Sequence, residues 1–265
     1  MAGNFPPLVQ QPLQGLHAVV TGGGSGIGAA IAQSLLQAGA RVTLMGRNRE
    51  RLQVQQLALA ALGEVGFQIV DVGDEVSVQR GFAAATALAP VDILVNNAGQ
   101  VETAPISRTS LELWQRMLQV NLTGTFLCSR EVLPVMTARG FGRIINVAST
   151  AALTGYAYVA AYCAAKHGVL GLTRAMAQET AKKGVTVNAV CPGYTETDIV
   201  DRAVQTIMQK TGRSADEARA ELAAGNPLGR LIQPQEVAAT VLWLARRDSA
   251  AINGQAISVC GGELP

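Results

Sequence analysis

Short, almost entirely apolar stretches alternate with longer helical patterns from residue 17 to the end of the chain. Such strands are typical of a parallel sheet covered on both faces, because each crossover between neighbouring parallel strands carries a helix. The sequence therefore predicts a single-domain α/β fold, a Rossmann-like, doubly wound parallel sheet of about seven strands. The predicted strands are 17–20, 41–45, 67–70, 91–95, 143–147, 185–190 and 256–259, and the predicted helices are 27–37, 49–62, 75–88, 111–132, 159–183 and 234–246.

Breaks in this alternation of strands and helices indicate the domain organisation. Residues 1–14 contain three prolines and are expected to form a loose N-terminal arm, and residues 15–265 a single domain. The one long interruption, 194–227, mixes charged and helix-forming residues between the sixth strand and the last helix. Such segments often act as lids, so we expect a flap over a substrate site. A surface helical insertion without function is the alternative.

Composition excludes several classes of partner. The formal net charge is +2, without basic runs, which gives no reason to propose nucleic acid. No stretch approaches the roughly 20 apolar residues that cross a bilayer, and the N-terminus does not resemble a signal peptide. The cysteines form no CxxC pair or Cys/His cluster, so we expect no metal site, no disulfide framework and a cytoplasmic location. They are Cys128, Cys163, Cys191 and Cys260.

A glycine-rich turn, TGGGSGIG at 21–28, falls between the first predicted strand and the first predicted helix. Glycines at this place let the backbone approach a pyrophosphate at the positive end of the helix. The spacing GxxxGxG differs from the strict GxGxxG fingerprint, but the position after the first strand favours a nucleotide site.

The residues that end the second strand indicate which cofactor binds. An NAD enzyme usually carries an acidic residue there for the ribose 2′-hydroxyl, whereas this chain has Gly46 followed by Arg47. A guanidinium binds a 2′-phosphate through charge-assisted hydrogen bonds, so NADP(H) is favoured and NAD(H) is the alternative. Arg47 could instead be a solvated start of the next helix. Asp71 and Val72, just past the third strand, are candidates to contact the adenine.

Tyr162 and Lys166 lie four positions apart in the run YCAAK, which places both on one face of a predicted helix. The ordinary tyrosine pKa is near ~10, and we expect the neighbouring ammonium group to lower it. Ser149, upstream on another element, could hold the oxygen of a carbonyl or alcohol. We interpret Ser149, Tyr162 and Lys166 as catalytic groups that transfer a proton at a ketone or secondary alcohol while another group transfers the hydride. His167 points about 100° away around the helix and is expected to pack rather than catalyse.

Together, these features resemble the short-chain dehydrogenase/reductase family over residues 15–262. The turn at 21–28 resembles the TGxxxGxG cofactor turn of the family, NNAG at 96–99 resembles the segment that steadies the central sheet, and Pro192-Gly193 with Thr195 and Thr197 resembles the PGxxxT segment. The resemblance implies that Asn121, Ser149, Tyr162 and Lys166 form a catalytic tetrad. The predicted cofactor contacts are Gly22, Ser25, Gly26, Ile27, Gly28, Arg47, Asp71, Val72, Asn97, Ala98, Gly99, Tyr162, Lys166, Pro192, Gly193, Thr195 and Thr197.

In this resemblance Tyr162 protonates the carbonyl oxygen and Ser149 polarises the carbonyl. Lys166 lowers the pKa of Tyr162 and binds the nicotinamide ribose. Asn121 bends its helix and holds a water in the proton relay.

The substrate is less sharply indicated. The runs AAYCAAKHGVLGLTRA and AVCPGYTETD look similar to ketoreductases of 3-oxoacyl thioesters, including polyketide ones, whereas TGRSADEARAEL also looks like hydroxybutyrate-type dehydrogenases. We therefore expect an NADP(H)-dependent reductase of a 3-oxoacyl thioester, with CoA or a carrier protein as the thiol, or of a related small ketone. The alternatives are an NAD(H)-linked dehydrogenase of a hydroxyacyl-CoA or secondary alcohol, and a non-catalytic cofactor-binding scaffold. The resemblance also implies a homotetramer, or sometimes a dimer.

Overall fold

Seven parallel strands form one sheet in the order β3-β2-β1-β4-β5-β6-β7 in the computed structural model, which describes residues 11–264. This confirms the expected doubly wound α/β fold. The strands are β1 (His17–Thr21), β2 (Arg41–Gly46), β3 (Val65–Ile69), β4 (Ile93–Asn96), β5 (Gly142–Val147), β6 (Val185–Pro192) and β7 (Ala256–Val259).

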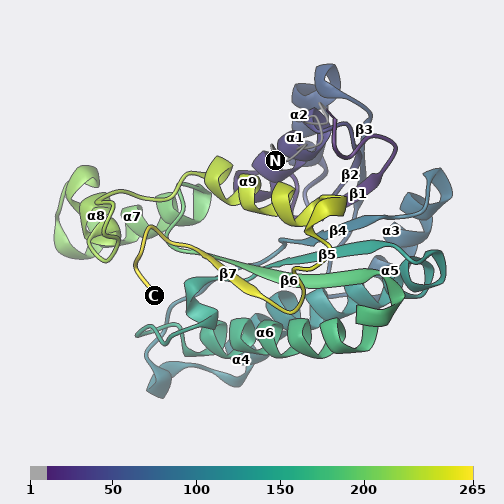
Figure 1. Cartoon of the computed structure of the whole chain (residues 1–265). Coiled ribbons are helices and arrows are strands. Elements are labelled where there is room, and N and C mark those ends of the chain that lie inside the picture. Colours follow the sequence, from purple (N-terminus) through teal and green to yellow (C-terminus); the bar gives the residue numbers. More distant parts are fainter. Residues whose placement is uncertain (1–10, 265) are drawn as a thin grey trace, which may run out of the picture.

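Helices cover both faces of this sheet (Figure 1). Helices α1, α2 and α9 pack on one face and α3, α5 and α6 on the other, each layer with its own apolar core. Helices α7 and α8 stand apart, beyond the end of β6. The helices are α1 (Gly26–Gln37), α2 (Arg49–Leu59), α3 (Glu75–Leu88), α4 (Leu111–Leu118), α5 (Gly124–Arg139), α6 (Ala160–Thr180), α7 (Asp198–Thr211), α8 (Ala215–Ala223) and α9 (Pro234–Ala245).

Burial on both faces explains why the central strands read as unbroken apolar runs. All residues of β1, β4, β5 and β6 are buried. Some polar side chains in these strands pair inside the sheet; the side-chain amide of Asn96 in β4, for example, donates to Asn146 Oδ1 of β5 at 2.9 Å. Within residues 11–264, no helix is long and apolar enough to cross a membrane.

One helix boundary differs from the expectation. The predicted helix 111–132 runs further, through α4, a π-helical turn at Gln119–Thr123 and α5, to Arg139. It passes Pro134 and ends at Gly140, whose φ of 66° is the left-handed conformation typical of a helix end. Val132 and Met136 are buried one turn apart, so packing on the sheet outweighs the local cost of the proline, about 3 kcal/mol.

The N-terminal arm is the second correction. Residues 1–10 of the predicted arm lie outside the described residues. Residues 11–14 are not loose, because Leu13 is fully buried in the core beside α1 and its backbone N–H donates to the carbonyl of Ala38 at 2.9 Å.

The strand order fixes where a site can form. The chain leaves β1 towards β2 on one side, and β4 returns to pair with β1 on the other side. At such a reversal the connecting loops diverge and leave a crevice outside the carboxyl ends of the strands. The glycine turn follows β1 and the NNAG segment includes the end of β4, so both lie at this crevice.

Candidate active site

Thr21 and Asn97 hold the glycine turn in shape. The Thr21 hydroxyl accepts the N–H groups of Asn97 and Ala98, both at 3.0 Å. The Asn97 side-chain amide donates to the carbonyls of Thr21 and Gly22 at 2.9 and 3.2 Å. A Cβ at Gly28 would lie 2.3 Å from the Gly22 oxygen, so this close packing requires glycine. The sheet end and the turn therefore form one rigid unit.

The glycine turn places the N-terminus of α1 at the crevice. Ser25 is the N-cap of α1, but its side chain makes no capping hydrogen bond, and the first turn of the helix contains no acidic residue. The first N–H groups of the helix are thus free of a side-chain acceptor and carry the positive end of the helix dipole. The site fits a pyrophosphate at this place.

Beside the turn lies a pocket of about 240 Å³. Arg47, Arg51 and Gly46 line it, so the position at the end of β2 that carries an acidic residue in NAD enzymes carries none here. Arg47 precedes Asn48, the residue that caps α2, so it is not part of the helix. The lining residues are Gly22, Gly24, Ser25, Gly46, Arg47, Asn48, Arg51, Leu52, Val70, Asp71, Val72, Ala98, Gly99 and Val120.

Asp71 lies at the same pocket. Its Oδ1 accepts the N–H of Gly73 at 2.9 Å, and its Oδ2 lies 3.9 Å from the Arg47 guanidinium. The Arg47 side chain is 64% exposed, so this ion pair is weak and leaves the guanidinium able to take another anion.

The catalytic candidates meet past the end of β5. Ser149 follows β5 and begins a short 3-10 turn, with its Oγ accepting the N–H of Ala151 at 3.1 Å. Tyr162 and Lys166 lie in the first turns of α6, and the Tyr162 phenol lies close enough to the Ser149 hydroxyl for that group to lower its pKa. The Lys166 Nζ lies 5.6 Å from the centre of the Tyr162 ring and donates to the Val147 carbonyl at 2.9 Å. The structure thus brings these three side chains together.

Burial acts on the two α6 side chains in opposite directions. It raises the pKa of Tyr162 to about 12, although the hydrogen bond to Ser149 works the other way. It lowers the pKa of Lys166 to about 8. The expectation of a Tyr162 pKa below its ordinary value is therefore wrong for this structure, because removing the phenolate from water outweighs the hydrogen bond to Ser149.

Asn121 occupies the π-helical turn between α4 and α5 and is fully buried. Its side-chain amide donates to the carbonyls of Gln100 and Met117, and its Oδ1 accepts the N–H of Gln100 at 3.1 Å. A Cβ at Gly99 would lie 2.8 Å from that Oδ1 and 3.7 Å from the Lys166 Nζ. Asn121 thus ties its helix to the loop after β4, close to Lys166. The π turn is typical of functional sites.

The segment after β6 crosses the crevice. The hydroxyl of Thr195 donates to the Gly193 carbonyl at 2.9 Å, and that of Thr197 donates to the Thr195 carbonyl at 3.1 Å. A Cβ at Gly26 would lie 3.1 Å from the Thr197 methyl group, so this segment touches the glycine turn. Pro192, the last residue of β6, starts the crossing.

Helices α7 and α8 join the sheet through a narrow stem. Thr195 and Ile232 form an isolated parallel bridge, in which the Ile232 N–H donates to the Tyr194 carbonyl and the Glu196 N–H donates to the Ile232 carbonyl, both at 2.9 Å. The two helices pack on each other around a separate apolar cluster. That these helices close over a substrate stays a prediction.

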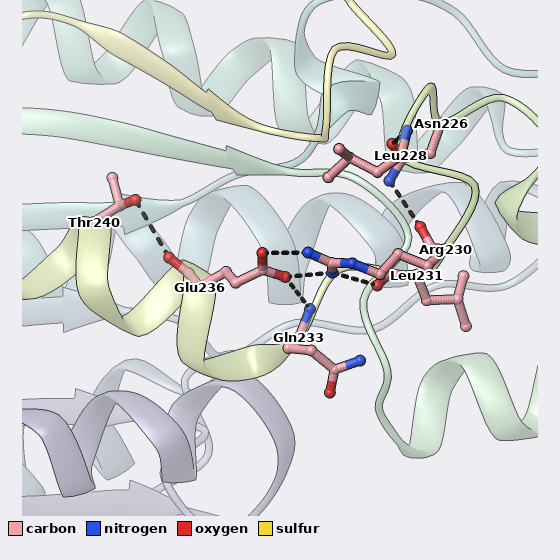
Figure 2. A network of polar contacts seen from close by, with 7 residues as sticks. All are labelled: Asn226, Leu228, Arg230, Leu231, Gln233, Glu236 and Thr240. Atoms are coloured by element: carbon pink, nitrogen blue, oxygen red, sulfur yellow. Dashed lines mark hydrogen bonds and ion pairs between the residues drawn. The ribbon is translucent and has the colours of Figure 1, made fainter.

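A polar network fixes the returning end of this stem to α9 (Figure 2). Both terminal nitrogens of Arg230 donate to Glu236 at 2.8 Å, and Glu236 also accepts the N–H of Gln233 at 2.7 Å. These bonds lower the pKa of Glu236 to about 2. Asn226 bridges the turn by donating to the Arg230 carbonyl at 2.8 Å.

Several residues at the site escaped the sequence reasoning. Arg51 lies four positions after Arg47, a spacing that could have indicated a second cation at the pocket, and it pairs with Asp198 at 2.8 Å. Tyr156 and Glu263 lie at the loop that follows Ser149, and Tyr194 packs against Tyr156. No local pattern could have found them, because Glu263 meets Tyr156 across 107 positions of the chain.

His167 is exposed, and its Nδ1 lies 2.9 Å from the carbonyl of Cys163 on the same helix. It does not join the catalytic group.

Known proteins share the sequence pattern and the fold of this chain. The profile of the short chain dehydrogenase family matches residues 16–207. The chain is 42% identical over 249 residues to a protein named as ketoacyl reductase 1 of the granaticin polyketide synthase of Streptomyces violaceoruber, covering 92% of each. It is 37% identical to a D-β-hydroxybutyrate dehydrogenase of Rhizobium meliloti, covering 92% of this chain and 97% of that protein. A solved actinorhodin polyketide ketoreductase with NADPH superposes with a TM-score of 0.90 at 38% identity, covering 97% of this chain and 99% of that one.

Proposed function

This chain belongs to the short-chain dehydrogenase/reductase family, and from that premise we propose that it is an NADP(H)-dependent ketoreductase of a 3-oxoacyl thioester or a related ketone. Membership makes it an oxidoreductase that interconverts CH–OH and carbonyl groups with NAD(P). The observation that carries the proposal is the meeting of Tyr162, Ser149 and Lys166 at the carboxyl edge of the sheet, beside a pocket lined by arginine.

Tyr162 is the proton donor of the proposed reduction. A phenol with a pKa of about 12 carries its proton at neutral pH, so Tyr162 is ready to donate it to a carbonyl oxygen. The Ser149 hydroxyl, close to the same phenol, can hold that oxygen in place. Lys166 keeps a positive charge close by, which stabilises the phenolate left after the transfer. The bound nicotinamide supplies the hydride.

The preference for NADP(H) is supported by the pocket beside β2. Gly46 presents no carboxylate, and Arg47 and Arg51 both line the pocket. Such groups favour a phosphate on the ribose. The solved relative with NADPH points the same way.

The 3-oxoacyl substrate is supported by likeness to the ketoacyl reductase and the polyketide ketoreductase. The likeness to a hydroxybutyrate dehydrogenase keeps a hydroxy acid as the second candidate. We also propose a homotetramer, since α5 leaves the large apolar side chains of Phe126 and Val135 more than 40% exposed.

The experiment that tests the proposal follows NADPH oxidation with ethyl acetoacetate and an acetoacetyl thioester. Wild-type protein is expected to reduce both, faster with NADPH than with NADH. Tyr162→Phe removes the transferable proton and is expected to lower kcat by at least about 10²-fold. NADPH binding, measured by its fluorescence, should survive the substitution, and retained turnover would show that Tyr162 is not the acid.

A further inference from the structure

The C-terminal segment brings a carboxylate close to the loop that follows Ser149. The Tyr156 hydroxyl donates to Glu263 Oε1 at 2.5 Å and lies 2.9 Å from the hydroxyl of Thr150, the neighbour of the catalytic Ser149. A Cβ at Gly193 would lie 3.0 Å from Glu263 Oε2. Glu263 therefore lies between the catalytic-serine loop and the segment after β6.

Two tyrosines pack beside this carboxylate. The rings of Tyr156 and Tyr194 meet edge to face with their centres 6.5 Å apart. Tyr194 contributes to the raised pKa of Tyr162. The Glu263 carboxylate in turn raises the pKa of both Tyr156 and Tyr194. Tyr156, Tyr194 and Glu263 thus form an aromatic cluster that carries one carboxylate.

No neighbouring cation neutralises the Glu263 carboxylate within the part of the chain that the structure describes. Among residues 11–264, no lysine, arginine or histidine nitrogen lies within 4.0 Å of the Glu263 carboxylate. Glu263 is partly buried, so water screens its charge less than it would on an open surface.

We propose that Glu263 selects against substrates that carry a free carboxylate, so that the ketone reduced at Tyr162 is uncharged around its carbonyl, as in an ester or a thioester. This inference rests on the proposed ketoreductase function and narrows its substrate class. It favours the 3-oxoacyl thioester over the hydroxy acid, because a carboxylate beside the ketone would face the carboxylate of Glu263. Incompletely screened repulsion of this kind is expected to cost about a factor of ten in affinity.

The experiment compares two substrates that differ in charge, acetoacetate and ethyl acetoacetate, with NADPH and the full chain. Wild-type protein is expected to have a kcat/KM for the ester at least about tenfold above that for the acid. Glu263→Gln keeps an acceptor for the Tyr156 hydroxyl but removes the charge, and should lower this ester-to-acid ratio about tenfold. Glu263→Lys should lower it further. An unchanged ratio in both variants would overturn the proposal.

Glu179→Gln is the matched control, because Glu179 is exposed near the far end of α6, about 25 Å along the helix from Tyr162. It removes the same charge and should leave the ratio as in the wild type. A second measurement uses the complex with NADP⁺, in which no ketone can be reduced. Wild-type protein should bind acetoacetamide about tenfold more tightly than acetoacetate, and Glu263→Gln should bind both alike.

The two measurements separate the failure of one proposal from that of the other. A protein that reduces neither ketone contradicts the ketoreductase function, yet the binding ratio still tests Glu263. A protein that reduces the ester and the acid equally well contradicts only the role of Glu263.

Discussion

Burial at this site decides what single side chains can do. Tyr162 and Lys166 lie on one face of α6, as their spacing predicts, but the spacing alone suggested a lowered tyrosine pKa. In the structure burial raises the pKa of Tyr162 and lowers that of Lys166. The residue types therefore indicate the chemistry, whereas the protonation states depend on how the surrounding elements exclude water.

Among single side chains, Arg47 is predicted to bind the 2′-phosphate of NADPH. Arg47→Gln should weaken NADPH binding about tenfold and NADH binding less than about twofold, because charge-assisted bonds to a phosphate are worth about 1.5–3 kcal/mol. Fluorescence titration with both cofactors measures the two constants. Arg49→Gln is the control, since Arg49 begins α2 but does not line the pocket. Equal losses for NADPH and NADH would mean that Arg47 does not read the 2′-phosphate.

Elements meet at this site through close backbone contacts. The turn after β1, the loop after β4 and the N-terminus of α1 approach one another so closely that side chains are excluded from Gly22 and Gly28. The π-helical turn at Gln119–Thr123 brings Asn121 to the same loop. The sequence marks these places with glycine and asparagine, but it does not specify the π turn, which an unbroken helical pattern hides.

Gly28 carries the prediction at the scale of elements. Gly28→Ala should destabilise the protein by about 1–3 kcal/mol and weaken cofactor binding, because its Cβ would meet the Gly22 carbonyl oxygen at 2.3 Å. Urea unfolding measures the change. Gly171→Ala in α6 is the matched control, with nothing within 4 Å of the added Cβ, and should stabilise by about 0.5–1 kcal/mol. Stabilisation by both substitutions would refute the close approach.

Burial of Lys166 lowers the free energy of unfolding of the whole protein at pH values where the lysine is charged. Its folded pKa of about 8 lies below the ordinary value of 10.5. Between these two values the unfolded chain binds more protons than the folded one, so folding stability rises with pH in this window. Below about pH 8 both states are protonated and the full cost applies.

Lys166→Met should therefore remove a rise in unfolding free energy of up to about 3 kcal/mol between pH 8 and 10.5. Unfolding of cofactor-free wild type and variant across this range gives the difference curve. Loss of the bond to the Val147 carbonyl shifts the curve by a constant and does not change its slope. Parallel stability curves for the two proteins would contradict the lowered pKa.

The sequence by itself determined the fold class, the order of strands and helices, and the segments that form the site. These follow from periodicities of a few residues and from glycines at turns, which are local properties of the chain. The cofactor turn and the pair Tyr162 and Lys166 were recognisable because their spacing lies within one element or directly after one, whereas the full tetrad was implied only by the family resemblance.

Only the tertiary structure decided the features that join distant segments. It continued α5 through Pro134, buried Leu13, and placed Glu263 against Tyr156 across 107 positions. It also reversed the expected shift of the Tyr162 pKa. Each of these depends on packing between segments far apart in the chain, where solvent exclusion outweighs local preference.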